Sequence, residues 1–137
     1  MKAVFADTGY WIALLRPNDP SHQRAITLAN ELKDNPIVTT DLIIVELLAR
    51  FCAEGSFLRK AAVHTVRRVM TSAQIEIVPI KDGLFMKAFE LYAKRHDKKW
   101  SLTDCASFEM MKRRHIKEAL AYDHHFEQAG FTALLRQ

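Results

Sequence analysis

Residues 2–7, KAVFAD, form an apolar run with little polar alternation that ends in an acidic residue, Asp7. Such a run is typical of a short strand that is buried on both faces of a parallel sheet. The residues that follow predict a short helix over 8–15, which Pro17 stops. We therefore expect an α/β fold in which Asp7 lies at the carboxyl end of the sheet, where open α/β proteins form their ligand crevice.

The alternation of strands and helices continues through the rest of the chain, with no internal repeat and no linker. The alternating Ile75 and Ile77, followed by Pro79, predict a strand at 75–80 near the edge of the sheet. This order predicts one α/β domain over residues 1–137, with a central parallel sheet of four to five strands flanked by helices. Further strands are expected at 37–39, 119–122 and 132–135, and further helices at 20–33, 41–53, 57–71, 81–96, 101–114 and 125–129.

The composition excludes several classes of protein. With 49% hydrophobic and 26% charged residues, the chain is globular rather than disordered. No apolar run approaches the roughly 20 residues that span a bilayer, and Asp7 interrupts the first run, so we expect no membrane contact, no signal peptide and a cytoplasmic location. Cys52 and Cys105 match neither a redox pair nor a zinc framework, and we expect both to be reduced and buried in helices.

Four acidic residues adjoin apolar segments: Asp7, Glu46, Asp104 and Asp123. Burying an unpaired anion costs several kcal/mol, so such carboxylates need a positive partner. Mg²⁺ and Mn²⁺ prefer hard carboxylate oxygens, and clustered carboxylates raise one another's pKa values until a cation joins them. The four acids therefore predict a magnesium or manganese site and phosphate chemistry, which makes the chain a candidate metal-dependent nuclease.

Each acid also has an explanation that needs no metal. These are an N-cap of the first helix for Asp7, an ion pair with Arg50 for Glu46, a capping box with Ser101 for Asp104 and a turn for Asp123. In a parallel sheet, however, acids that end two strands can meet at the same edge, beside the first strand. The helix that begins near Asp104 leads into the strand before Asp123, so the four acids together favour one shared site.

Four segments carry a resemblance to a known family. They are Asp7-Thr8 after the first strand, Glu46 within IIVELLAR, SLTD at 101–104 and DHHFEQAGF at 123–131. Over nearly the whole chain they are similar to the PIN domain, the nuclease fold of VapC-type toxins in bacterial toxin–antitoxin pairs. The resemblance implies a metal-dependent endoribonuclease with Asp7, Glu46, Asp104 and Asp123 as an acidic quartet, supported by the polar residues Thr8 and Ser101. Ala121 departs from the pattern, because related sequences often carry Thr or Ser there to support the metal site.

The expected chemistry is hydrolysis of RNA by a metal-activated water, which leaves a 5′-phosphate and a 3′-hydroxyl. The net charge of +4 weakly favours an anionic partner, and basic runs occur at 59–68, 94–99 and 112–117. We expect Lys60, Arg67 and Arg68 to contact RNA phosphates, because they share one helical side with His64. Each basic run is also explained as a solvated helix face.

Two aromatic groups have a structural and a functional explanation. Trp100 suits either base stacking or packing at the edge of the core. His124 and His125 adjoin Asp123 and suggest zinc, but the sequence offers no tetrahedral ligand set, so we assign both to turn and surface roles.

The functional alternatives differ in class and in partner. The chain is expected to be the toxin of a toxin–antitoxin pair, with an antitoxin as its protein partner, or a solitary RNA-processing nuclease without one. A noncatalytic PIN-like RNA-binding module is the other class, and an aspartyl phosphatase is disfavoured because Gly9 occupies the position of its second acid. We also expect a homodimer, with Tyr10 and Trp11 either in the core or in the dimer face.

Overall fold

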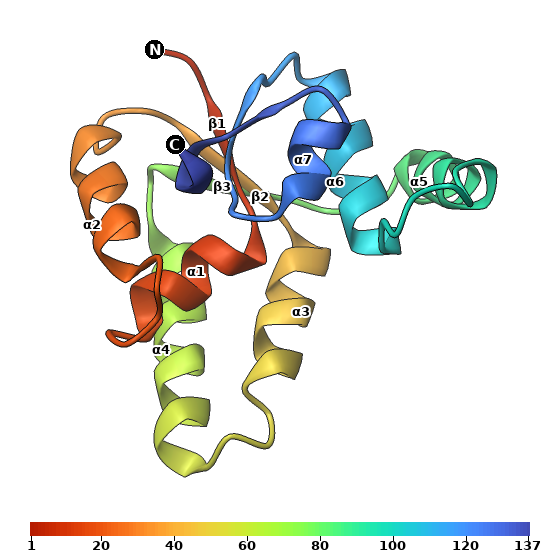
Figure 1. Ribbon diagram of the computed structural model, residues 1–137. Coiled ribbons are helices and arrows are strands. Elements are labelled where there is room, and N and C mark those ends of the chain that lie inside the picture. The colour runs from red at the N-terminus through yellow and green to blue at the C-terminus, as the bar shows by residue number, and fades with distance from the viewer.

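Five parallel strands form the centre of the molecule: β1 (Val4–Ala6), β2 (Ile37–Thr40), β3 (Ile75–Val78), β4 (Glu118–Leu120) and β5 (Thr132–Ala133). Their order across the sheet is β3-β2-β1-β4-β5. Strand β1 is therefore central, with β2 on one side and β4 on the other, and the computed structural model describes all 137 residues around it (Figure 1).

Seven α-helices and a final 3₁₀ turn surround this sheet. Helices α1 to α4 pack on one another, and α5 packs against α6 on the other side of the molecule (Figure 1). Helices α3 and α4 run side by side and extend away from the sheet. The helices are α1 (Thr8–Leu15), α2 (His22–Glu31), α3 (Asp41–Arg50), α4 (Ser56–Thr71), α5 (Leu84–Lys94), α6 (Leu102–Arg113) and α7 (His124–Gln128), and the 3₁₀ turn is η1 (Leu134–Arg136).

Burial explains why the first strand is an uninterrupted apolar run. Val4, Phe5 and Ala6 are completely buried, as a central strand covered on both faces requires. The ring of Phe5 lies 6.1 Å from the ring of Phe126 on α7. Phe108 on α6 packs edge-on against Phe126, with 5.0 Å between the ring centroids. These contacts hold α6 and α7 together over the central strand.

The predicted fold class is confirmed: the molecule is one α/β domain with a five-stranded parallel sheet flanked by helices. The strand after residue 74 lies at the sheet edge, as predicted, and α1 has the predicted bounds. Residues 81–83 do not join α5, because Asp82 and Gly83 adopt left-handed φ angles of 54° and 81°, which a right-handed helix excludes.

Other differences lie at element ends, where capping and turns override the apolar pattern. The helix expected at 41–53 ends at Arg50, and the strand expected at 119–122 ends at Leu120. The last strand stops at Ala133 and continues as the turn η1. The prediction that both cysteines are buried in helices is wrong for Cys52, which is exposed beyond the end of α3, and right for Cys105 on α6.

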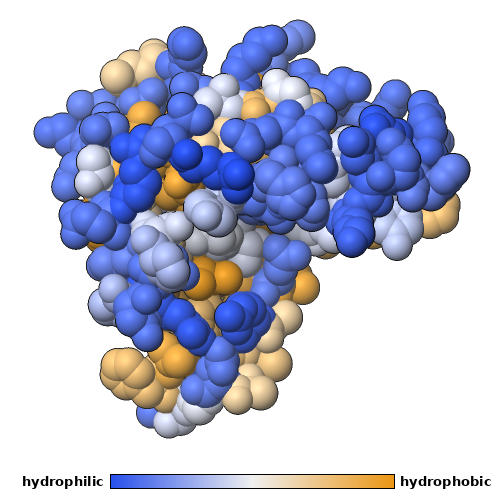
Figure 2. Space-filling view, in the orientation of Figure 1, coloured by the Kyte–Doolittle hydropathy of each residue, from blue (hydrophilic) through white to orange (hydrophobic).

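The surface is mostly hydrophilic in the view of Figure 2, with apolar side chains gathered toward the protruding end of α3 and α4. Phe57, at the start of α4, is 82% exposed. None of the helices combines the length and the apolar character that crossing a bilayer requires. The large apolar side chains that are exposed on the helices are Val45, Leu48, Phe57, Val63, Met70, Phe85, Met86, Phe89 and Tyr92.

Candidate active site

One cleft of about 680 Å³ contains all four of the acids that the sequence singles out. It lies where β1 leads into α1, between α3 on one side and the starts of α6 and α7 on the other. Parallel strands with helices on both faces bring these segments together at the carboxyl edge of the sheet. The lining residues are Asp7, Thr8, Gly9, Ile12, Glu46, Ala49, Arg50, Lys99, Ser101, Asp104, Tyr122, Asp123 and His125.

Asp7 is held at the floor of the cleft by the central strand. Its backbone N–H donates to the carbonyl of Leu120, at 3.1 Å, which ties the end of β1 to the end of β4. Asp7 is the N-cap residue of α1, but its side chain makes no capping hydrogen bond, so the capping explanation does not account for the carboxylate. The residue is only 9% exposed.

Burial and neighbouring charge raise the pKa of Asp7 to about 8. Loss of hydration is the largest cause, followed by the negative charge of Asp104, while the Thr8 backbone N–H acts in the opposite direction. The charges of Glu46 and Asp123 raise this pKa further. The predicted mutual repulsion of the clustered carboxylates is therefore present at Asp7.

Glu46 reaches the cleft from the middle of α3. Ile43 and Leu47 on the same helix are completely buried, and Thr40 caps its start by accepting a hydrogen bond from the Ile43 N–H at 3.2 Å. The Glu46 carboxylate accepts a hydrogen bond from the Thr8 hydroxyl. The alternative ion pair with Arg50 is wrong, because Arg50 pairs instead with Glu54 at 3.0 Å.

Asp104 serves the helix and the cleft at the same time. Its carboxylate accepts the Ser101 backbone N–H, and the Ser101 hydroxyl accepts the Asp104 backbone N–H, both at 3.0 Å. This is the predicted capping box at the start of α6. The same carboxylate lies 3.1 Å from Nδ1 of His125. Burial raises the pKa of Asp104, as does Asp123, whereas the bonds to Ser101 and His125 lower it.

Asp123 does not directly follow a strand, although the sequence predicts that it does. Because β4 ends at Leu120, Asp123 is instead the N-cap of α7, and its carboxylate accepts the His125 backbone N–H at 3.0 Å. This corrects the prediction that Asp123 closes a strand. Its side chain, 40% exposed, forms the open rim of the cleft.

His125 is the site residue that sequence reasoning missed. Its Nδ1 lies 3.1 Å from Asp104 and 3.1 Å from Asp123, and its side chain is only 16% exposed. The assignment to a surface role is therefore wrong for His125 and right for His124, which is 59% exposed. Two features of the sequence could have identified His125. It lies two residues after Asp123, the N-cap of α7, and it is next to Phe126, which is completely buried.

The donor set of the cleft fits a hard divalent cation. No Lys or Arg nitrogen forms an ion pair with any of the four carboxylates, whereas Nδ1 of His125 lies 3.1 Å from both Asp104 and Asp123. Carboxylate oxygens suit Mg²⁺ or Mn²⁺, which retain several waters in an open site. Asp123, His124 and His125 also place ligand atoms within 4.8 Å of one another, but this trio is at the rim and supplies three ligands rather than the four of a closed zinc site.

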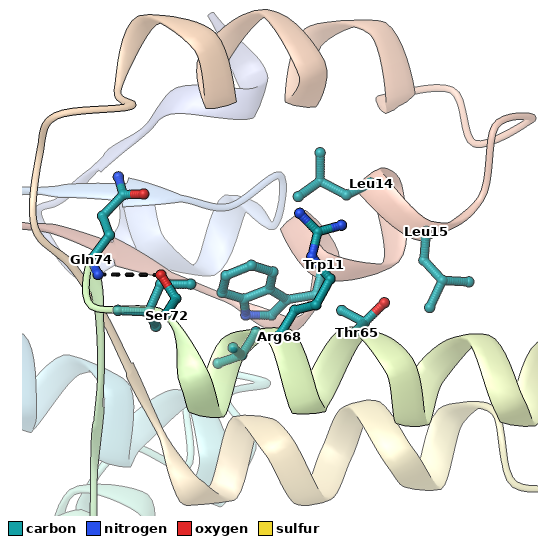
Figure 3. A pocket seen from close by; sticks show the side chains of 9 residues that line it. Trp11, Leu14, Leu15, Thr65, Arg68, Ser72 and Gln74 are labelled. Atoms are coloured by element: carbon teal, nitrogen blue, oxygen red, sulfur yellow. Dashed lines mark hydrogen bonds between the residues drawn. The ribbon is translucent and has the colours of Figure 1, made fainter.

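The cations that were expected to bind RNA lie outside the acidic cleft. Lys60, Arg67 and Arg68 are exposed on α4, and none of them lines the acidic cleft. Arg68 instead borders a separate cavity of about 280 Å³ between α1 and α4, where it lies beside Trp11 and Leu14 (Figure 3). Their role in RNA binding stays a prediction.

The tryptophans and Tyr10 belong to the core. Tyr10 and Trp11 are each 5% exposed. Trp100 donates its indole N–H to Gln128 at 3.0 Å and packs edge-on against Phe108. Packing at the edge of the core is therefore the correct explanation for Trp100.

Comparison with known proteins adds independent information. The model of the PIN domain family matches residues 4–132. The 23S rRNA-specific endonuclease VapC20 of Mycobacterium tuberculosis is 30% identical over 132 residues, which cover 94% of this chain and 95% of that protein.

Three crystal structures share the fold. The VapC20 structure from M. tuberculosis, described as a sarcin-ricin loop cleaving toxin, has a TM-score of 0.83 at 24% identity and covers 94% of this chain and 96% of its own. FitAcB from Neisseria gonorrhoeae has a TM-score of 0.65 at 18% identity, with 95% and 94% covered. VapBC2 from Rickettsia felis, bound to a promoter DNA fragment, has a TM-score of 0.68 at 10% identity, with 96% of both chains covered.

Proposed function

This chain belongs to the PIN domain family, and we propose that it is a metal-dependent endoribonuclease that hydrolyses phosphodiester bonds in RNA. The observation that carries the proposal is that Asp7, Glu46, Asp104 and Asp123 line one cleft and none of them has a Lys or Arg partner. Four carboxylates in one hollow are electrostatically unfavourable on their own, so the arrangement makes chemical sense around a divalent cation.

The four carboxylates are the groups that would hold Mg²⁺ or Mn²⁺. When bound, such a cation acts as a Lewis acid on the scissile phosphate and on the attacking water, and offsets charge on the leaving oxygen. Other residues of the chain hold these carboxylates in place. The Thr8 hydroxyl orients Glu46, and the Ser101 capping box together with His125 orients Asp104.

The open rim at Asp123 leaves room for a polymeric substrate. We assign attack by water in line with the leaving 3′-oxygen, which leaves a 5′-phosphate and a 3′-hydroxyl. Ala121 offers no hydroxyl to this site, and its carbonyl instead accepts the Leu135 N–H at 3.2 Å.

The biological setting follows from the relatives. The likeness to VapC20, whose crystal structure is described as a toxin that cleaves the sarcin-ricin loop, supports ribosomal RNA as the substrate class and a toxin role. An antitoxin is then the protein partner. The apolar side chains exposed on α3 and α4, Phe57 above all, support a protein contact there, and we include a homodimer in the proposal.

The test is cleavage of a defined RNA by purified protein, with and without chelator. Asp7→Asn should lower the rate by orders of magnitude while leaving the fold intact, because Asn keeps the size of the side chain and removes a charged ligand. Asp34→Asn is the matched control, since Asp34 is exposed, has no side-chain partner and lies outside the cleft.

Activity of wild type and of the Asp34 variant should disappear with chelator and return with magnesium or manganese. Cleavage that persists in chelator and in the Asp7 variant would exclude this mechanism. RNA binding without any cleavage would point to the noncatalytic module instead.

A further inference from the structure

A second hollow adjoins the acidic cleft at the connection between α5 and α6. It measures about 400 Å³ and is lined by Tyr92 and Arg95 at the end of α5, by His96, and by residues 98–101. Lys99 and Ser101 line this hollow and the acidic cleft alike. We call it the α5–α6 groove, and Lys99 and Ser101 form its shared border with the cleft, over which a polymer bound at the acids would pass.

Free positive charge is concentrated where the groove and the cleft join. Lys98 and Lys99 form no ion pair. The other cation that lines the cleft, Arg50, is neutralised by Glu54. Lys98 and Lys99 are therefore the unpaired cations beside a cleft that is otherwise negative, which is where a phosphate backbone approaching the acids needs compensation.

The groove also contains an arginine stacked on a tryptophan and an exposed aromatic ring. The Arg95 guanidinium lies 5.0 Å above the Trp100 ring and is held by both oxygens of Asp97, at 2.9 and 3.1 Å. Tyr92 is 52% exposed and lines the same hollow, so its ring has a free surface. Cations along a groove together with an exposed aromatic ring are the elements with which proteins bind single-stranded nucleic acid.

We propose that the α5–α6 groove binds the single-stranded RNA segment that flanks the scissile phosphate, with Lys98 and Lys99 on its phosphates and a base stacked on Tyr92. The inference rests on the proposed ribonuclease function and adds to it the path of the substrate. A single strand is required because a base within a duplex is already stacked and does not present its face to Tyr92.

Binding is measured on the full chain in an Asp7→Asn background, by fluorescence anisotropy of a labelled, unstructured RNA of about 12 nucleotides over a range of salt concentrations. Lys98→Ala with Lys99→Ala should weaken binding and reduce the slope of log affinity against log salt by about 0.7 for each lysine. Lys98→Arg with Lys99→Arg should retain the slope. Tyr92→Ala should weaken binding roughly tenfold, and Tyr92→Phe should not.

Two double variants serve as references. Lys2→Ala with Lys117→Ala removes the same charge from a hollow of about 140 Å³ at the amino ends of β1 and β4. This hollow is at the end of the strands opposite to the acidic cleft, so the double variant should keep the wild-type salt slope. Arg67→Ala with Arg68→Ala tests the cations of α4, and a smaller change of slope than at Lys98 and Lys99 supports the groove as the main path.

Several outcomes would overturn the proposal. An unchanged salt slope in the Lys98/Lys99 alanine variant would do so, and so would a slope that falls equally in the Lys2/Lys117 control. Equal dependence on Tyr92 for a blunt RNA duplex would exclude the single-strand assignment. An oligoglutamate peptide that binds more tightly than RNA, with the same lysine dependence, would assign the groove to an acidic protein segment.

Failure of the nuclease proposal gives a different pattern of results. If wild-type protein does not cleave RNA but binding still depends on Lys98, Lys99 and Tyr92, the groove assignment stands alone. If metal-dependent cleavage is observed but RNA affinity does not change when Lys98, Lys99 and Tyr92 are replaced, the nuclease proposal stands and the groove assignment is wrong.

Discussion

Asp7 shows how a single residue couples the fold to the chemistry. It follows a completely buried strand, so its backbone position is determined by the core, while its carboxylate faces three other acids. Loss of hydration favours the neutral acid, and the neighbouring charges act in the same direction. A bound divalent cation would reverse this balance, because it favours the ionised form that a ligand needs.

This gives a prediction for the pH dependence of stability without metal. The folded-state pKa of Asp7, about 8, lies above the ordinary value of 3.8. Between these values the folded protein holds a proton that the unfolded chain has released, so stability falls as pH rises and the loss is complete above about 8. The limiting slope for one group is about 1.4 kcal/mol per pH unit.

Denaturant unfolding in chelator at a series of pH values measures this slope. Asp7→Asn should show a smaller loss of stability with rising pH than wild type, because it lacks the titrating group. Saturating magnesium should flatten the wild-type curve. Parallel curves for the two proteins in chelator would mean that Asp7 titrates normally.

At the scale of elements, the start of α6 combines capping with placement of an acid. Ser101 and Asp104 exchange hydrogen bonds at 3.0 Å, which both begins the helix and directs the Asp104 carboxylate toward His125. Ser101 also lines both the cleft and the α5–α6 groove. The capping explanation of this motif is therefore confirmed, and its role in the site stays a prediction.

We expect Ser101→Ala to cost about 1 kcal/mol of stability, the usual loss for an N-cap. We also expect it to reduce RNA cleavage, because the Asp104 carboxylate loses part of the framework that orients it. Ser101→Thr should restore both properties, since Thr also caps helices. Unfolding curves and cleavage rates of the three proteins test this, and full activity in a destabilised Ser101→Ala protein would separate capping from catalysis.

At the scale of the whole molecule, the parallel sheet and its helices gather charges that are far apart in the sequence. Asp7 follows β1, Glu46 lies on α3, Asp104 lies on α6 and Asp123 precedes α7. Folding brings these like charges together at the expense of stability, and the hydrophobic core around β1 offsets that cost.

Metal binding should therefore be linked to folding. Asp104→Asn should raise the melting temperature of the metal-free protein, because it relieves repulsion while Asn retains much of the capping bond. Magnesium should stabilise wild type by RT ln(1 + [L]/Kd), and should stabilise this variant less. Thermal melts of both proteins with chelator and with magnesium test this prediction. If magnesium raises the two melting temperatures equally, and the metal-free variant melts no higher than wild type, the acids do not share an ion.

Local sequence patterns were sufficient to predict the fold class and to identify the candidate acids. The buried run at residues 2–7 and the alternation after it were sufficient for a parallel α/β sheet, because strand and helix periodicities are local properties. The capping box at Ser101 was equally readable, since its two partners are three residues apart. The four acids could be identified in the same way, because each is adjacent in sequence to an apolar segment.

Which side chains share a cleft depends on the packing of the helices and strands, and it became visible in the three-dimensional structure. His125 contacts Asp104 across 21 residues of sequence, and Lys99, rather than the cations of α4, lines the acidic cleft. The Glu46 carboxylate accepts the hydroxyl of Thr8, 38 residues earlier in the chain, and does not pair with Arg50. Such pairings depend on how the helices pack on the sheet, and local periodicity carries no information about distances between residues remote in the chain.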